Sequence, residues 1–173
     1  MFHDLGLPND ETFEAELHRC WLDPHREMQY VAMECMDRKK WYRREHAIAL
    51  IEWMITERSW WDTVDYIAAS LSGQYFQHFP QYTAPTVKRW NASENLWLIR
   101  SSILFQLKYK DKVDKQLLTT LIIPHLDSKE FFLQKAIGWA LRQVSKTDAA
   151  FVRSFVDSYS LKSVSLREAK KYI

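Results

Sequence analysis

Two segments of this chain align with each other at a distance of 35 residues. The segment 97–102 (WLIRSS) matches the segment 132–137 (FLQKAI), and each is followed by a second, capped amphipathic run. Extending the same shift towards the N-terminus takes Arg100 to Asp65 and Asp65 to Tyr30. A period in this range, with two helices per unit, is typical of HEAT-like (ARM-type) helical repeats, in which each unit packs on its neighbours. The chain is therefore predicted to form a curved, right-handed helical solenoid.

The scarcity of turn-forming residues also favours an all-α fold. The 173 residues include only three glycines and five prolines, which leaves little material for tight β-hairpins. Apolar residues recur at helical spacing in almost every segment, and residues suited to capping precede these runs. We expect a single domain over residues 1–173, with few or no strands and helices at about 10–21, 24–40, 43–57, 60–71, 75–79, 84–90, 94–108, 112–125, 129–145, 148–159 and 165–172.

Several classes of protein are disfavoured by composition. Cys20 and Cys35 are too few and too isolated for a disulfide framework, and no Cys/His cluster has metal-ligand spacing, so we expect no metal. No apolar run approaches the ~20 residues of a membrane span, and the N-terminus does not resemble a signal peptide. We therefore expect a cytoplasmic location (the bacterial cytoplasm or nucleoid) and no membrane partner. The formal net charge of +2 does not by itself indicate a nucleic-acid partner, so the distribution of charge matters more.

Two tryptophans and two aspartates are concentrated in the first two turns of the helix predicted at 60–71. Ser59 is predicted to cap this helix, and Asp62, three residues later, to act structurally in a capping box. The pair Ser72-Gly73 is predicted to end the helix.

Trp61 and Asp65 in this helix are four residues apart and therefore share one face, which places an indole beside a carboxylate. Such a pair can hold a cationic group. In an arbitrary helix the more common arrangement is that Trp60 and Trp61 are core residues and Asp65 is an exposed acid.

The repeat places Tyr30, Asp65, Arg100 and Lys135 at equivalent points of four successive long helices. Such a row is too polar for a core seam, so we expect it to line the concave surface of the solenoid. An alternative for Arg100 is that it is simply the ion-pair partner of Asp65 across the repeat boundary. Lys135 can equally be an ordinary solvated residue.

A second aromatic residue, Trp139, lies one turn beyond Lys135, and Arg142 and Lys146 continue the same helical face. An indole followed by two cations suits a phosphate backbone that is approached with an aromatic contact. The alternative is that Trp139 is a core residue and the cations complement the helix dipole. Further candidate DNA contacts, among basic residues near helix ends and turns, are Lys108, Arg43, Arg44 and Lys135.

These residues together resemble the AlkD-type DNA alkylation repair family, helical-repeat glycosylases that remove alkylated purines. The resemblance rests on the segments 60–65 (WWDTVD), 97–100 (WLIR) and 134–142 (QKAIGWALR) and on their mutual spacing, and it covers about residues 24–172. It implies that Asp65 is the catalytic aspartate and that Trp61 and Trp139 flank the sugar of the lesion. It further implies that Arg100 holds the nearby DNA backbone, that Arg142 and Lys146 contact phosphates, and that Tyr30 supports the lesion face.

The chain departs from the family pattern at its start. Members of the family usually carry about one more helical hairpin before the position equivalent to Met1, including an aromatic residue that helps to cradle the lesion. No part of this sequence matches that hairpin. We therefore expect a solenoid that is N-terminally shorter than the family norm.

The resemblance implies hydrolysis of the N-glycosidic bond of N3- or N7-alkylated purines in double-stranded DNA, with the lesion held against an open surface and not flipped into a closed pocket. Because an alkylated base already carries positive charge, it leaves neutral, and the single carboxylate of Asp65 suffices. No cofactor and no obligatory protein partner are implied, and we expect a monomer.

Two other functions remain open. The first is a non-catalytic helical-repeat module that binds DNA or protein, because solenoids more often bind than catalyse. The second is a helical scaffold whose aromatic residues all belong to the core, which requires Trp61 and Trp139 to be fully buried.

Overall fold

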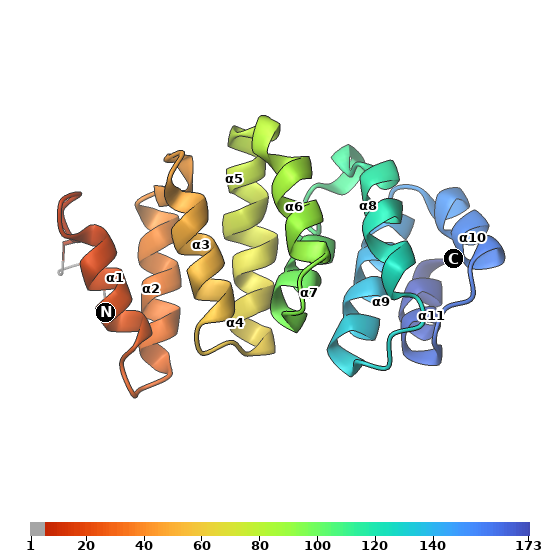
Figure 1. Cartoon of the computed structure of the whole chain (residues 1–173). Helices are drawn as coiled ribbons and strands as arrows, with labels where there is room; N and C mark the ends of the chain where they lie inside the picture. Colours follow the sequence, from red (N-terminus) through yellow and green to blue (C-terminus); the bar gives the residue numbers. More distant parts are fainter. Residues whose placement is uncertain (1–5) are drawn as a thin grey trace.

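The structure, a computed structural model, describes residues 6–173, and in this part of the chain it contains helices and no strands. The helices follow one another from α1 at one end to α10 and α11 at the other (Figure 1). The predicted all-helical solenoid is therefore confirmed. The helices are α1 (Phe13–Trp21), α2 (Glu27–Arg38), α3 (Ala47–Thr56), α4 (Trp61–Tyr66), α5 (Gly73–His78), α6 (Thr83–Asn91), α7 (Leu96–Leu104), α8 (Lys115–Ile122), α9 (Phe131–Ser145), α10 (Ala149–Ser158) and α11 (Ser163–Ala169).

The helices are arranged in two layers with the apolar core between them. One layer contains α1, α3, α6, α8 and α10, and the other contains α2, α4, α7, α9 and α11. Large side chains such as Trp21, Phe76 and Trp90 are buried between the layers. Burial of apolar side chains of this size is the main stabilising contribution to such a stack. None of the helices in residues 6–173 is long and apolar enough to cross a membrane.

Polar contacts between neighbouring units reproduce the repeat seen in the sequence. Arg100 donates to Asp65, and Lys162 donates to Asp127, and in both pairs the partners are 35 residues apart. The indole of Trp21 donates to the carbonyl of Glu57, 36 residues away. Residues about one period apart therefore lie side by side in successive units.

The helix that carries the two tryptophans does not end where the sequence predicts. It continues from α4 through a π-helix (Ile67–Ser72) into α5, and Figure 1 shows α4 and α5 as parts of one rod. A β-carbon on Gly73 would lie 2.7 Å from the carbonyl oxygen of Phe105, so glycine here permits a close approach of the chain after α7. The hydroxyl of Tyr109 also donates to the Gly73 carbonyl at 2.7 Å. The prediction that Ser72-Gly73 ends the helix is therefore wrong. The helix continues through Gly73, where the missing side chain lets the chain after α7 pack closely.

The predicted cap of α4 is also wrong. Trp60, with extended backbone (φ −147°, ψ 157°), is the residue that precedes the helix, and its side chain makes no capping bond. The hydroxyl of Ser59 instead donates to the carbonyl of Ile55 in the preceding helix. Asp62 is structural, but it does not form a capping box with Ser59. The helices α7, α8 and α10 also start after the predicted positions, and the side chains that cap them are those of Asn95, Asp114 and Asp148.

Candidate active site

Asp65 and Arg100 form the centre of the candidate site. Asp65 lies in α4, and its two carboxylate oxygens accept hydrogen bonds from Nε and Nη2 of Arg100 in α7, at 2.7 and 2.8 Å. The Arg100 side chain is only 1% exposed, whereas that of Asp65 is 19% exposed. A bidentate pair of this kind fixes the plane of the carboxylate as well as its position. Asp65 is therefore held in place by the following repeat and keeps one side towards solvent.

The electrostatic environment of Asp65 contains opposing influences. Burial raises the pKa of the Asp65 carboxyl, the ion pair with Arg100 opposes this change, and the nearby charge of Asp62 adds to it. The net direction is upward from the usual range. Asp65 is thus a carboxylate whose ionised form is less favoured than that of a free aspartate.

The two predicted indoles belong to the same region. Trp61 begins α4 one turn before Asp65 and is 42% exposed. Trp139 in α9 is half-buried, and the guanidinium carbon of Arg100 lies 5.3 Å from the centroid of its ring. Arg100 therefore contacts both Asp65 and Trp139. Neither indole is sealed in the core, which contradicts the scaffold alternative.

An aromatic cluster beside this site was not predicted. The ring of Trp60 lies 6.3 Å from Trp97 and 5.8 Å from Phe132, and Trp97 lies 5.3 Å from Phe132. Trp60, taken as a core residue in the commoner interpretation, is 47% exposed. Trp97 and Phe132 occupy equivalent points of successive repeats. The 35-residue alignment could therefore have indicated that these two rings lie side by side. The starts of α4, α7 and α9 thus present a continuous aromatic surface.

The side chain of Arg100 lies between Asp65 and the start of α9. Its guanidinium is buried, with Nε and Nη2 bound to Asp65 and Nη1 donating to the carbonyl of Phe132. These contacts take up its donors in the structure, and a direct contact with the DNA backbone stays a prediction. The alternative, an ion pair with Asp65 across the repeat boundary, describes the geometry.

The cations of α9 are paired with an acid that the sequence analysis missed. Lys135 and Arg142 each form an ion pair of 2.7 Å with Glu168 in α11. The Nζ atom of Lys135 and the guanidinium carbon of Arg142 also lie near the Trp139 ring, at 5.9 and 6.0 Å from its centroid. These pairs lower the pKa of Glu168, mainly through the hydrogen bond from Lys135. A ligand phosphate that binds Lys135 and Arg142 must therefore compete with Glu168.

The remaining predicted DNA contacts are dispersed. Lys146, after α9, is exposed, and its Nζ lies 5.5 Å from the Tyr172 ring. Lys108, after α7, is also exposed and donates to the Ser70 hydroxyl at 2.6 Å. Arg43 and Arg44 follow the far end of α2 and are not brought together with Asp65. Arg43 is exposed, and Arg44 is paired with Asp10 and lies 3.9 Å from the Trp41 ring centroid.

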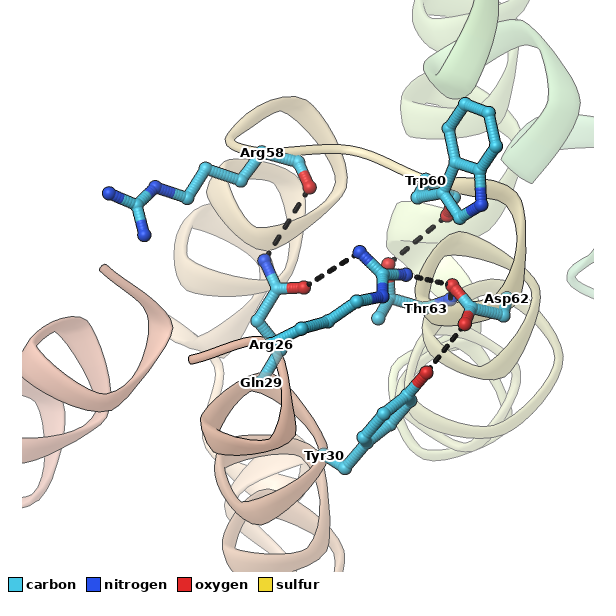
Figure 2. Close-up of polar contacts among 7 residues, drawn as sticks. All are labelled: Arg26, Gln29, Tyr30, Arg58, Trp60, Asp62 and Thr63. Carbon is cyan, nitrogen blue, oxygen red and sulfur yellow. Dashed lines mark hydrogen bonds and ion pairs between the residues drawn. The ribbon is translucent and has the colours of Figure 1, made fainter. Parts of the chain in front are cut away.

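Tyr30 lies in α2, and its side chain reaches the start of α4. Its side chain is exposed, and its hydroxyl donates to Asp62 at 2.6 Å, as Figure 2 shows. Asp62 also binds Arg26, so a second acid–cation pair stands beside the pair of Asp65 and Arg100. In residues 6–173 no group of three or more His, Cys, Asp or Glu side chains is arranged to hold a metal ion.

The fold and this site define a helical-repeat protein with a polar and aromatic face built around one fixed carboxylate. Residues 1–173 match the family described as DNA alkylation repair enzyme, and the chain belongs to that family. It is similar to a solved structure described as "Predicted DNA alkylation repair enzyme from Enterococcus faecalis", with a TM-score of 0.87 and 29% sequence identity. The similarity covers 96% of this chain and 78% of that chain. No protein with a curated description matches the chain.

Proposed function

We propose that this protein is a DNA glycosylase that hydrolyses the N-glycosidic bond of cationic N3- or N7-alkylated purines in double-stranded DNA. The observation that carries the proposal is the Asp65 carboxylate, which Arg100 fixes in a helix that begins with the exposed Trp61, while the same Arg100 lies 5.3 Å from the ring centroid of the half-buried Trp139. Membership of the DNA alkylation repair enzyme family supports DNA as the partner.

Asp65 acts on the sugar in this mechanism. Each carboxylate oxygen has a second lone-pair site besides the one bound by Arg100, and the side chain keeps part of its surface open. The ionised carboxylate stabilises the positive charge that develops on the sugar and orients the attacking water. The alkylated base leaves neutral and needs no proton, so one acid is enough.

The aromatic residues hold the lesion against the surface. Trp61 and Trp139 present ring faces to the developing cation, an effect of about 0.5–2 kcal/mol per contact by analogy with cation–π pairs. Tyr30 supports this face from α2. Because Trp61 is 42% exposed, a lesion can be contacted here without extrusion into a closed pocket, unlike the substrates of most base-processing enzymes.

The cations around the site bind the DNA backbone. Lys135, Arg142 and Lys146 follow one another along α9 and its end, with Trp139 between the first two. Phosphates attracted to this row fix the position of the duplex and give binding that weakens with salt. Lys108, which is exposed after α7, is a separate candidate phosphate contact.

A base-release assay tests the proposal. Wild-type protein is expected to release 7-methylguanine from methylated duplex DNA, and Asp65→Asn is expected to lose about 100-fold or more of this activity while it still binds DNA. Asp157→Asn, at an exposed position of α10, is the matched control and is expected to behave as wild type. Full activity of Asp65→Asn, with its fold verified by circular dichroism, would falsify the proposal.

The alternative is a helical-repeat module that binds DNA or protein without catalysis. It is favoured by the pairing of both Asp65 oxygens with Arg100, since such a pair can also serve packing alone. The same assay separates the two functions, because a binding module retains affinity for the duplex and releases no base in any variant.

A further inference from the structure

A second carboxylate stands one helical turn before Asp65. Asp62 is 27% exposed and accepts three hydrogen bonds: from the Tyr30 hydroxyl at 2.6 Å, from Nη2 of Arg26, and from the backbone N–H of Thr63 at 2.7 Å. Figure 2 shows Tyr30 of α2, and Arg26 just before α2, reaching towards this carboxylate. Residues three apart on a helix are neighbours on its surface, so Asp62 and Asp65 lie close in space.

The partners of Asp62 belong to a network that fixes the start of α4. Arg26 also donates to the side-chain oxygen of Gln29 at 3.3 Å, and Gln29 donates to the carbonyl of Arg58 at 3.5 Å (Figure 2). The hydroxyl of Thr63 donates to the carbonyl of Trp60 at 3.1 Å. The connection that presents both tryptophans to solvent is therefore held to α2 largely through Asp62.

We propose that Asp62 is a positioning residue for the reaction at Asp65: it anchors the start of α4 to Arg26 and Tyr30, and its negative charge acts on the Asp65 carboxylate one turn further along. This inference rests on the proposed function for its catalytic consequence. Its electrostatic part is independent of that function.

The charged groups around the two acids form separate pairs. Asp65 faces Arg100 from α7, and Asp62 faces Arg26 from α2, together with the Tyr30 hydroxyl. The cations of α9, Lys135 and Arg142, are both paired with Glu168 of α11. Within residues 6–173, the charge of Asp62 thus acts against the ionised form of Asp65, and Arg26 limits its effect.

The direction of each substitution follows from these pairs. The charge of Asp62 adds to the effect of burial in raising the pKa of Asp65, so Asp62→Asn is expected to lower that pKa. Arg26→Gln leaves the charge of Asp62 uncompensated and is expected to raise it. Tyr30→Phe removes a hydrogen bond from the same network and changes no charge, which makes it the matched control.

The first experiment is a carboxyl NMR titration of Asp65 in wild type and the three variants. The titration midpoint is expected to move down in Asp62→Asn, and to move up by a smaller amount in Arg26→Gln, because the charge of Arg26 lies beyond Asp62. Tyr30→Phe is expected to leave it in place. Because the two charges are partly exposed, both shifts are expected to shrink at high salt.

The second experiment is the pH profile of 7-methylguanine release by the same proteins. The acid limb of the profile is expected to move with the titration midpoints, while all three variants turn over more slowly because α4 is less firmly held. A purely structural role would slow all three variants and leave both the acid limb and the titration unchanged, and this result would overturn the inference. If wild type releases no base, the proposed function fails, and the titration still decides the role of Asp62.

Discussion

At the scale of single residues, Arg100 fixes the position of the Asp65 carboxylate and links it to the start of α9. It is a cation at 1% exposure, which is tolerated because Asp65 and the Phe132 carbonyl take up its donors. Removing one partner of a buried pair leaves an uncompensated charge, which costs about 3–5 kcal/mol. The geometry also depends on the planar fork of the guanidinium, which an ammonium group does not reproduce.

Arg100→Lys is therefore expected to lose stability and activity together although it keeps the charge. We expect a decrease of about 2–3 kcal/mol in the free energy of unfolding, somewhat less than for a full loss of the pair. Urea denaturation and base release measure the two effects. Arg153→Lys, exposed on α10, serves as the control. An unchanged urea midpoint in Arg100→Lys would show that the bidentate pair does not stabilise the fold.

The activity of the wild-type protein is expected to depend on the ionisation of Asp65. Burial raises the pKa of this carboxyl, against the opposing effect of Arg100, so the group becomes protonated at a higher pH than a free aspartate, whose pKa is about 3.9. The rate of base release is therefore expected to fall as pH drops through this raised pKa, by about tenfold per unit below it. A pH–rate profile that is flat down to pH 4 would argue against an ionised Asp65 in the reaction.

At the scale of helices, the contact between α9 and α11 controls the cations beside Trp139. A β-carbon on Gly138 would lie 2.5 Å from the β-carbon of Glu168 and 2.9 Å from the carbonyl oxygen of Ser165. Glycine at this point lets α11 approach closely enough for Glu168 to bind Lys135 and Arg142. The packing of α11 thus determines how far the charges of Lys135 and Arg142 are compensated.

Gly138→Ala is expected to push α11 away, to destabilise the protein by about 1–3 kcal/mol, and to release the two cations from Glu168. Affinity for undamaged duplex DNA is then expected to rise and to depend more steeply on salt. Glu168→Gln tests the charge effect without the steric one and is expected to give the same change in salt dependence. If the salt dependence stays as in wild type in both variants, Glu168 does not compete with phosphate.

The sequence predicted the helices and their repeat better than the partners of individual side chains. Hydrophobic periodicity and the 35-residue alignment identify which residues share a helix and which occupy equivalent positions. They do not identify Glu168 as the partner of Lys135 and Arg142, because that choice depends on how closely α11 packs. The π-helix Ile67–Ser72 was equally hidden, since its residues are apolar or small and fit an ordinary helix pattern.

At the scale of the whole molecule, stability in acid depends on carboxylates that bridge neighbouring units. The hydrogen bond from Arg89 lowers the pKa of Glu52, which also accepts from the Trp90 indole at 2.9 Å. The hydrogen bond from Lys135 lowers the pKa of Glu168. A carboxyl whose pKa is lowered by folding contributes stability above its unfolded pKa, and this contribution is lost as pH falls through the folded value.

The free energy of unfolding is therefore expected to decrease as pH falls below about 4.5, the range in which an unfolded glutamate becomes protonated. Denaturant unfolding at a series of pH values from 7 to 3 measures this decrease. Glu52→Gln is expected to be less stable than wild type at pH 7 and to show a shallower decrease in acid. Parallel curves for the two proteins would mean that Glu52 is not linked to acid unfolding.

The pairing of Asp65 with Arg100 spans the boundary between two successive units, since the acid belongs to α4 and its partner to α7. Neither helical hairpin contains both members of the pair, so the pair exists only where the two units meet. An extra hairpin inserted between α5 and α7 would preserve each local sequence motif and yet separate the two halves. In this chain, any change in the bend of the array at that joint would also change the geometry of the pair of Asp65 and Arg100.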